Sequence, residues 1–174
     1  EVVSEMEFDL AIKIGVDPAS IIVNGPYKTF RQLEKFLKYG SVLHIDSQIE
    51  LNNIIQIMER LPTSKCKVAL RCNFDIENNI VSRFGFDVED PTFFECVQKL
   101  QSYSNAELVG LHCHFPDRNL ESYKKRIKKM ILLVDKLFKV PPKYIDVGGG
   151  YFGRLDETLK QHFGEPPTYE EYAA

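Results

Sequence analysis

Short apolar runs rich in β-branched residues alternate six times with amphipathic stretches along this chain of 174 residues. The short runs have the composition of buried strands, and the stretches between them have the apolar periodicity of helices. This alternation predicts an α/β fold in which each strand is followed by a helix. The predicted strands are Val2–Ser4, Ser20–Asn24, Val42–Ile45, Lys67–Asn73, Leu108–His114 and Tyr144–Val147. The predicted helices are Met6–Ile14, Phe30–Tyr39, Gln48–Leu61, Thr92–Ser102, Leu120–Phe138 and Leu155–Phe163.

Strands this apolar are buried on both faces, which predicts a parallel sheet covered by helices. An open doubly wound sheet and a (β/α)8 TIM-type barrel both satisfy the pattern, and the regular spacing of the units favours the barrel. A Rossmann fold is disfavoured because the glycine cluster follows the sixth strand rather than the first. Six units do not close such a barrel, so we predict that residues 1–174 are its central portion, without the first and last strands.

The composition excludes several classes of protein. The net charge is −3, and 44% of the residues are hydrophobic, which is enough to fill one core. The longest apolar runs, such as Met130–Val134, are far shorter than the ~20 residues of a membrane span. The basic cluster Lys124–Lys129 is expected to cover the outer face of a helix, so we expect neither a nucleic-acid nor a membrane partner. The cysteines form no CxxC pair, which predicts reduced thiols and a cytoplasmic location.

Three consecutive glycines follow the sixth predicted strand directly. Glycines at such a point expose backbone N–H groups that no Cβ blocks, as in sites that hold a phosphate group. The run Gly148, Gly149 and Gly150 therefore predicts a phosphate cradle at the carboxyl end of a strand.

His112 and His114 lie two residues apart on the fifth predicted strand, so both side chains are expected on one face. The pair suits a metal site of the kind found in barrel hydrolases, a platform for a flat ligand, or buried core histidines. Only His44 and His162 remain as further histidines, and His44 lies inside a strand. A ligand set is therefore incomplete, and no metal site is assigned.

Two basic residues also lie at predicted strand ends. Arg71 follows an apolar run, so its guanidinium needs a carboxylate, a phosphate or another anionic partner. Lys28 follows Gly25-Pro26-Tyr27, where a Schiff base is conceivable but a solvated or ion-paired amine is the preferred interpretation.

Together these residues resemble the ornithine/diaminopimelate/arginine decarboxylases, which are pyridoxal-phosphate enzymes of the alanine-racemase-like class. The resemblance runs in order over nearly the whole chain. The matching segments are Ser4–Glu7, Ile22–Lys28, Asp46–Glu50, Leu70–Asn73, Ser82–Gly85, Gly110–Phe115 and Asp146–Gly153.

The resemblance implies a barrel that binds pyridoxal 5'-phosphate, followed in the whole protein by a β-rich domain. It implies that His114 stacks on the pyridine ring and that Arg71 neighbours the cofactor. Gly148, Gly149 and Gly150 would hold the phosphate, and Ser4 is also taken as a cofactor-binding residue.

The sequence departs from the family pattern in several places. The family's Schiff-base lysine lies on a strand before this chain begins, so no catalytic residue is assigned and the chain alone is expected to be inactive. The ring-nitrogen glutamate and the carboxyl-terminal domain would follow Ala174. In place of a Gly-Ser phosphate contact the chain has Phe115–Arg118, where Asp117 would repel a phosphate unless Arg118 replaces that contact.

The leading functional hypothesis is a homodimeric pyridoxal-phosphate-dependent amino-acid decarboxylase, a lyase of polyamine or lysine biosynthesis. Alternatives are a non-catalytic or regulatory homologue, an amino-acid racemase with the same cofactor, and a metal-dependent barrel hydrolase that uses His112 and His114. The substrate itself is not specified by these residues.

Overall fold

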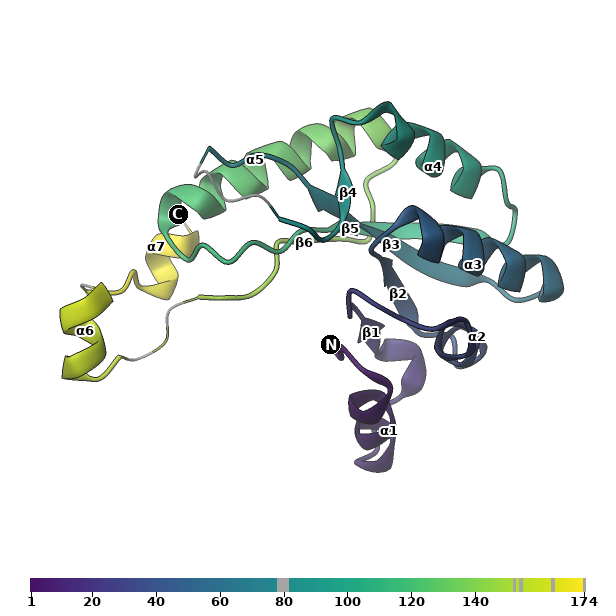
Figure 1. The fold of residues 1–174 in the computed structure, drawn as a ribbon, viewed down its shortest axis with the longest axis horizontal. Helices are drawn as coiled ribbons and strands as arrows, with labels where there is room; N and C mark the ends of the chain where they lie inside the picture. The colour runs from purple at the N-terminus through teal and green to yellow at the C-terminus, as the bar shows by residue number, and fades with distance from the viewer. Residues whose placement is uncertain (78–81, 152, 154, 164, 174) are drawn as a thin grey trace.

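The computed structural model describes residues 1–77, 82–151, 153, 155–163 and 165–173, and its sheet curls into part of a barrel (Figure 1). The strands lie side by side in the order β1, β2, β3, β5 and β6, and the short β4 pairs with the end of β3. Each pairing between these strands is parallel, which confirms the predicted α/β fold and its incomplete barrel. The strands are β1 (Ile22–Val23), β2 (Val42–Ile45), β3 (Cys66–Asn73), β4 (Phe86–Asp87), β5 (Ala106–His112) and β6 (Tyr144–Asp146).

After α1, which precedes β1, the helices follow the strands along the chain, and α3, α4 and α5 lie along the outer side of the arch (Figure 1). Each of α1 to α5 begins after a residue whose side-chain oxygen accepts a backbone N–H of the first turn. The helices are α1 (Glu5–Lys13), α2 (Phe30–Lys38), α3 (Gln48–Arg60), α4 (Pro91–Gln101), α5 (Leu120–Leu137), α6 (Glu157–Phe163) and α7 (Tyr169–Ala173). A 3₁₀ turn, η1, spans Pro18–Ser20.

The core lies between the sheet and these helices. Residues 68–72 of β3 are all buried, so both faces of the central strand are covered, as the apolar run predicts. From α3, Leu51 and Ile54 are fully buried and belong to the same hydrophobic cluster as Val68 and Leu70. The sheet and the outer helices therefore share one core.

The first predicted strands are shorter than expected. Val2 makes only an isolated bridge to Val23, because Ser4 already serves as the N-cap of α1. The second strand begins at Ile22 rather than Ser20, because Asp17 caps η1. In both places a side-chain cap competes with strand pairing for the backbone N–H groups.

Besides the 3₁₀ turn η1, two short elements were not predicted. The strand β4 has only two residues, and α7 has five, so neither shows a readable periodicity. The other helices begin and end within two residues of the predicted bounds.

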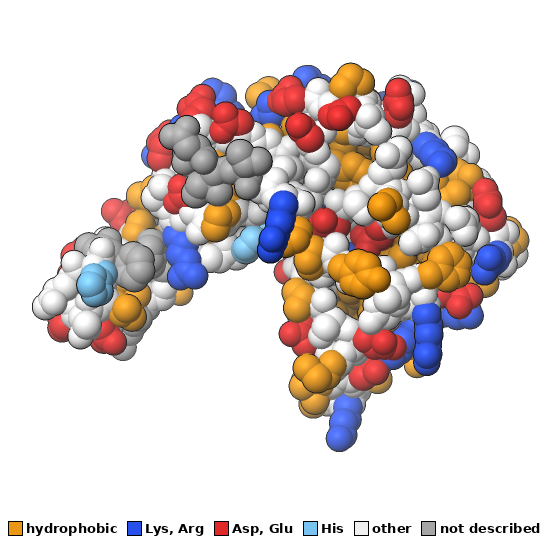
Figure 2. Space-filling view, viewed as in Figure 1, with side chains coloured by type: hydrophobic (Ala, Val, Ile, Leu, Met, Phe, Trp, Pro, Cys, Tyr) orange, Lys and Arg blue, Asp and Glu red, His pale blue; other side chains and the backbone are white. Residues whose placement is uncertain are grey.

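The cysteines are free and buried, as predicted. Among the described residues, no helix has both the length and the apolar character needed to cross a membrane. The space-filling view shows histidine and basic side chains at the inner edge of the arch, where the strands end (Figure 2).

Candidate functional site

A pocket of about 410 Å³ lies at the carboxyl ends of the strands. Parallel α/β folds place their chemistry at this edge, because the loops that follow each strand meet there. The wall contains five of the residues singled out in the sequence, together with Phe84, Glu1 and Asn24, among others. Those five are Arg71, His112, His114, Gly148 and Gly149.

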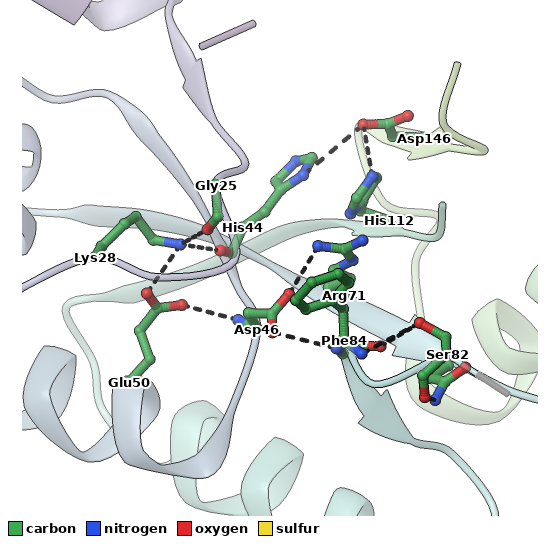
Figure 3. A network of polar contacts seen from close by, with 12 residues as sticks. Gly25, Lys28, His44, Asp46, Glu50, Arg71, Ser82, Phe84, His112 and Asp146 are labelled. Carbon is green, nitrogen blue, oxygen red and sulfur yellow. Dashed lines mark hydrogen bonds and ion pairs between the residues drawn. The ribbon is translucent and has the colours of Figure 1, made fainter. Parts of the chain in front are cut away.

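Two buried ion pairs lie beside the pocket, between β2, β3 and α3 (Figure 3). In the first, Lys28 Nζ lies 2.9 Å from Glu50 Oε1 and also donates to the carbonyl oxygens of Gly25 and His44. Burial lowers the pKa of Lys28 and raises the pKa of Glu50, and each partner opposes that effect on the other. The Lys28 amine is therefore fully engaged, which confirms the ion-paired interpretation.

In the second pair, Arg71 Nη1 donates to Asp46 Oδ1 over 2.9 Å. The other oxygen of Asp46 accepts the backbone N–H of Gly85 over 3.3 Å, and the guanidinium of Arg71 lies over the ring of Phe84 at 5.0 Å. The ion pairs are joined because Glu50 Oε2 accepts the Asp46 backbone N–H. Arg71 is thus held rigidly while its side chain still lines the pocket.

A separate cluster lies on the β5–β6 side and consists of His44, His112 and Asp146 (Figure 3). His44 Nδ1 and His112 Nε2 each lie 3.8 Å from Asp146 Oδ2, and the two ring centroids are 4.6 Å apart. On its other side His44 Nε2 is hydrogen-bonded to the Tyr144 hydroxyl at 2.8 Å. Burial lowers the pKa of His44 to about 4 and, together with neighbouring His44, that of His112 to about 2, so both rings are neutral near pH 7.

The glycine turn follows directly from this cluster. Asp146 Oδ1 accepts the Gly148 N–H over 2.8 Å, and Gly148 has φ +75°. A Cβ on Gly148 would lie 2.6 Å from the Cys113 carbonyl oxygen and 2.7 Å from His114 Nδ1, so only glycine fits. The turn therefore packs against the end of the histidine strand.

Helix α5 supports the glycine turn from outside. The Tyr123 hydroxyl donates to the Gly149 carbonyl oxygen over 2.7 Å. A Cβ on Gly150 would lie 3.9 Å from Arg118 Nε, so the Arg118 side chain lies beside the turn. The Asp117 carboxylate accepts hydrogen bonds from the backbone and side chain of Asn119, at the start of α5.

The structure brings most, but not all, of the predicted residues together. Ser4 lies apart: its hydroxyl accepts the Glu7 N–H at the start of α1, and it lines a second pocket of about 150 Å³. Gly150 does not line the main pocket but is contiguous with Gly149, which does. His112 and His114 line the same pocket, as their spacing predicts; His112 is buried and His114 is exposed.

Sequence reasoning missed Tyr144, Glu50 and Tyr123 as partners of site residues. It also set His44 aside as a residue inside a strand. All four lie within regular helices or strands, and only the packing of the sheet shows which residues they contact.

The comparison with family models matches residues 1–173 to the "Pyridoxal-dependent decarboxylase, pyridoxal binding domain". The match covers nearly the whole chain. The chain belongs to the pyridoxal-dependent decarboxylases. Pyridoxal phosphate is therefore the cofactor of its family, and the resemblance seen in the sequence motifs is confirmed.

Curated relatives of this family include diaminopimelate decarboxylases. A probable chloroplastic enzyme of Oryza sativa subsp. japonica is 32% identical over 85% of this chain and 32% of its own length. The enzyme of Aquifex aeolicus is 30% identical over 86% of this chain and 38% of its own length. A crystal structure of diaminopimelate decarboxylase from Helicobacter pylori complexed with L-lysine has a TM-score of 0.79 at 23% identity, over 99% of this chain and 45% of that one. The chain thus spans between a third and a half of the length of these relatives.

Proposed function

We propose that residues 1–174 are the central portion of the pyridoxal-phosphate-binding barrel of an amino-acid decarboxylase. The observation that carries the proposal is the pocket at the strand ends, whose wall combines a glycine turn, an imidazole and a fixed guanidinium. Pyridoxal phosphate is a flat ring with a dianionic phosphate, and these groups suit both parts of it. The close fit of Gly148 against Cys113 and His114 leaves no room for a side chain there and fixes the turn beside the pocket.

The glycine turn is the part of the site that we assign to the phosphate. The Gly148 N–H is already used by Asp146, so among the residues that the structure describes the amides of Gly149 and Gly150 are the ones that we assign to an anion. In a trans peptide the N–H and C=O point in opposite directions. Because the Gly149 carbonyl is held by Tyr123 of α5, the Gly150 N–H is directed away from that helix. The Arg118 side chain beside Gly150 adds positive charge, in place of a Gly-Ser contact.

We assign the ring of the cofactor to the part of the wall formed by His114 and Arg71. His114 lines the pocket, where partial desolvation of the imidazole and the charge of Arg71 lower its pKa and favour the neutral form of this flat ring. Arg71 is held in place by Asp46, so it offers a fixed positive charge to the ring substituents. Ser4 stays a predicted contact, since its present role is the N-cap of α1.

When bound, pyridoxal phosphate supplies the electron sink that takes up the electron pair left when carbon dioxide departs. The chain's own residues orient and hold that group. Lys28 is not assigned a covalent role, because its amine is buried against Glu50 and bonded to two backbone carbonyl oxygens. The substrate that we propose is an amino acid, and the names of the relatives favour diaminopimelate. The homodimer and the cytoplasmic location stay predictions.

Cofactor binding is the direct test. Pyridoxal phosphate and pyridoxal, which lacks the phosphate, are titrated into the chain and into variants, with the absorbance of the ring as the readout. We expect Arg118→Ala to weaken binding of pyridoxal phosphate about tenfold or more and to leave pyridoxal unchanged, because the lost contact is to the phosphate. His114→Ala should weaken both compounds.

The matched control is Arg31→Ala, on the exposed face of α2. It removes the same charge far from the pocket and should change neither affinity. Equal affinity of wild type for the two compounds would contradict the assigned phosphate site.

Because the chain alone is expected to be inactive, the reaction is tested on the full-length protein loaded with the cofactor, with diaminopimelate, arginine and ornithine as substrates. Release of carbon dioxide supports a decarboxylase. Loss of optical purity without carbon dioxide release identifies the racemase alternative, and cofactor binding with neither reaction identifies the regulatory homologue. Asp117, which departs from the family's phosphate contact and so favours that last alternative, directs its carboxylate to Asn119.

A further inference from the structure

In the proposed cofactor site, the cluster of His44, His112 and Asp146 contributes only the wall contact of His112 and the hydrogen bond from Gly148 N–H to Asp146 Oδ1, and the three facing ligand atoms are not used. Its residues come from the ends of β2, β5 and β6, so strands far apart in the sequence deliver three ligand-type side chains to one point. Figure 3 shows the edges of both imidazoles directed to the same oxygen of Asp146. We propose that these three residues form a site for one divalent transition-metal ion of the zinc type.

Three polar atoms in the cluster are buried without a hydrogen-bond partner among the described residues: His44 Nδ1, His112 Nδ1 and Asp146 Oδ2. The two distances of 3.8 Å to Asp146 Oδ2 are too long for hydrogen bonds. A buried polar atom without a partner costs about 1–3 kcal/mol. An ion bound by His44 Nδ1, His112 Nε2 and Asp146 Oδ2 would satisfy two of these three atoms.

The spacing of the ligand atoms suits a metal ion. The three atoms lie within 4.8 Å of one another, and two of the separations are 3.8 Å. Atoms spaced in this way share a point about 2.5 Å from each, and zinc–ligand bonds are about 2.0–2.2 Å long. Movements of a few tenths of an ångström would therefore complete three bonds.

The surroundings of the cluster also match a metal site. The Tyr144 hydroxyl holds His44 Nε2 over 2.8 Å, which fixes the ring with its other nitrogen facing Asp146. Partners of this kind orient metal-ligating histidines. The neighbouring cations Lys28 and Arg71 are each neutralised by an ion pair, with Glu50 and Asp46 respectively.

Two histidines and one carboxylate leave a coordination position open. His112 lines the pocket, so that position faces the pocket rather than the core. A water molecule or a small ligand with an oxygen or nitrogen donor can reach it. The set of nitrogen and oxygen ligands favours zinc, cobalt or iron over calcium or magnesium.

The test uses metal-free chain, prepared with a chelator and titrated with CoCl₂ while the visible absorption bands of the ion are recorded. We expect saturation at one Co²⁺ per chain and displacement by ZnCl₂. His44→Asn and Asp146→Asn should each weaken binding about a hundredfold, and Tyr144→Phe about tenfold. Circular dichroism and thermal melting of each variant establish that it is folded, and Tyr144→Phe, which removes only a hydroxyl, keeps the test valid if the ligand variants do not fold.

Two control variants test whether the metal ion binds at this cluster or at another histidine. His162→Asn removes an exposed histidine on α6 and should leave binding unchanged. His114→Ala removes the histidine assigned to the cofactor and should also leave it unchanged.

The proposal is overturned if wild type shows no saturable binding, or if Tyr144→Phe and His44→Asn both bind as wild type does. It is equally overturned if His114→Ala abolishes binding, which would place the metal on the His112–His114 pair. Binding of pyridoxal phosphate to the metal-free chain is measured in a separate titration. A chain that binds no metal ion would therefore not contradict the proposed function.

Discussion

Two groups of buried charged and polar residues lie side by side at the strand ends, and they differ in how well they are satisfied. On the β2–β3 side, each charge has an opposite partner, in the pairs Lys28–Glu50 and Arg71–Asp46. On the β5–β6 side, His44 Nδ1, His112 Nδ1 and Asp146 Oδ2 are buried without a hydrogen-bond partner among the described residues.

The difference distinguishes buried groups that only stabilise the fold from buried groups that can bind a ligand. A paired group is complete within the protein and needs nothing further, whereas an unsatisfied buried group indicates that a ligand, an ion or a water molecule belongs there. On the paired side, the ion pair with Asp46 fixes the Arg71 side chain. On the unsatisfied side, the cluster of His44, His112 and Asp146 adjoins the glycine turn and the pocket. The predictions below test whether the two sides respond in these different ways.

The largest effect is expected from Glu50→Gln on the paired side. It leaves the Lys28 charge buried without its partner, so the free energy of unfolding should fall by about 3–5 kcal/mol. Chemical denaturation followed by circular dichroism measures it. The double variant Lys28→Met, Glu50→Met removes both charges and should lose less than the single variant. A double variant that is less stable than the single one would contradict this account of the pair.

A pH dependence of stability is expected from the unsatisfied side. The pKa of His44 falls from its ordinary value near 6.5 to about 4 in the folded chain, so the unfolded chain binds the proton first. The contribution of His44 to stability is therefore complete above about pH 6.5 and falls by about 3 kcal/mol as the pH drops to about 4, and His112, with its still lower pKa, adds to the fall. Unfolding curves of chelator-treated chain across this range measure the slope. His44→Asn should reduce it, and an unchanged slope would show that another group titrates.

The glycine turn offers a matched pair of substitutions. Gly148→Ala places a Cβ against Cys113 and His114 at a φ of +75°, and should lower the free energy of unfolding by about 2–3 kcal/mol. Gly149→Ala meets no atom within 4 Å and should change it by less than about 0.5 kcal/mol. Thermal melting compares the two. Equal losses would mean that the turn does not pack as the structure has it.

The smallest effect is expected at the contact between α5 and the glycine turn. Tyr123→Phe removes the hydroxyl that donates to the Gly149 carbonyl and should cost about 1 kcal/mol. Its aromatic contacts with Tyr151 and Tyr172 remain. The binding of pyridoxal phosphate should weaken more than that of pyridoxal, because the turn is assigned to the phosphate. Tyr103→Phe, whose hydroxyl bonds to Glu59 on the outer surface, is the control and should change neither affinity.

Much of the fold was predictable from local patterns. The bounds of β2 and the starts of α2, α3 and α5 were correct, because apolar periodicity and N-caps are properties of neighbouring residues. The prediction of a strand at Val2–Ser4 was wrong because two local signals compete there. The apolar run favours a strand, whereas Ser4 favours the start of a helix as its N-cap. The very short β4 depends on pairing with β3 and carries almost no signal of its own.

The site was predictable only in part. Arg71, His114 and the glycine turn were found because parallel strands place their carboxyl ends at one edge, a rule that needs only the order of strands along the chain. The ion-pair prediction for Arg71 named the kind of partner, and the structure identified Asp46. His44 was missed as a neighbour of His112, because it lies on β2 and reaches that residue across the curled sheet.

The sequence by itself determined the α/β class, the family and the edge of the sheet where the chemistry lies, because these follow from periodicity and from motifs of adjacent residues. Only the tertiary structure decided which buried groups are paired and which are not. That depends on distances between strands separated by as many as 100 residues, as between His44 and Tyr144. Curvature of the sheet sets those distances, and no short stretch of sequence encodes it.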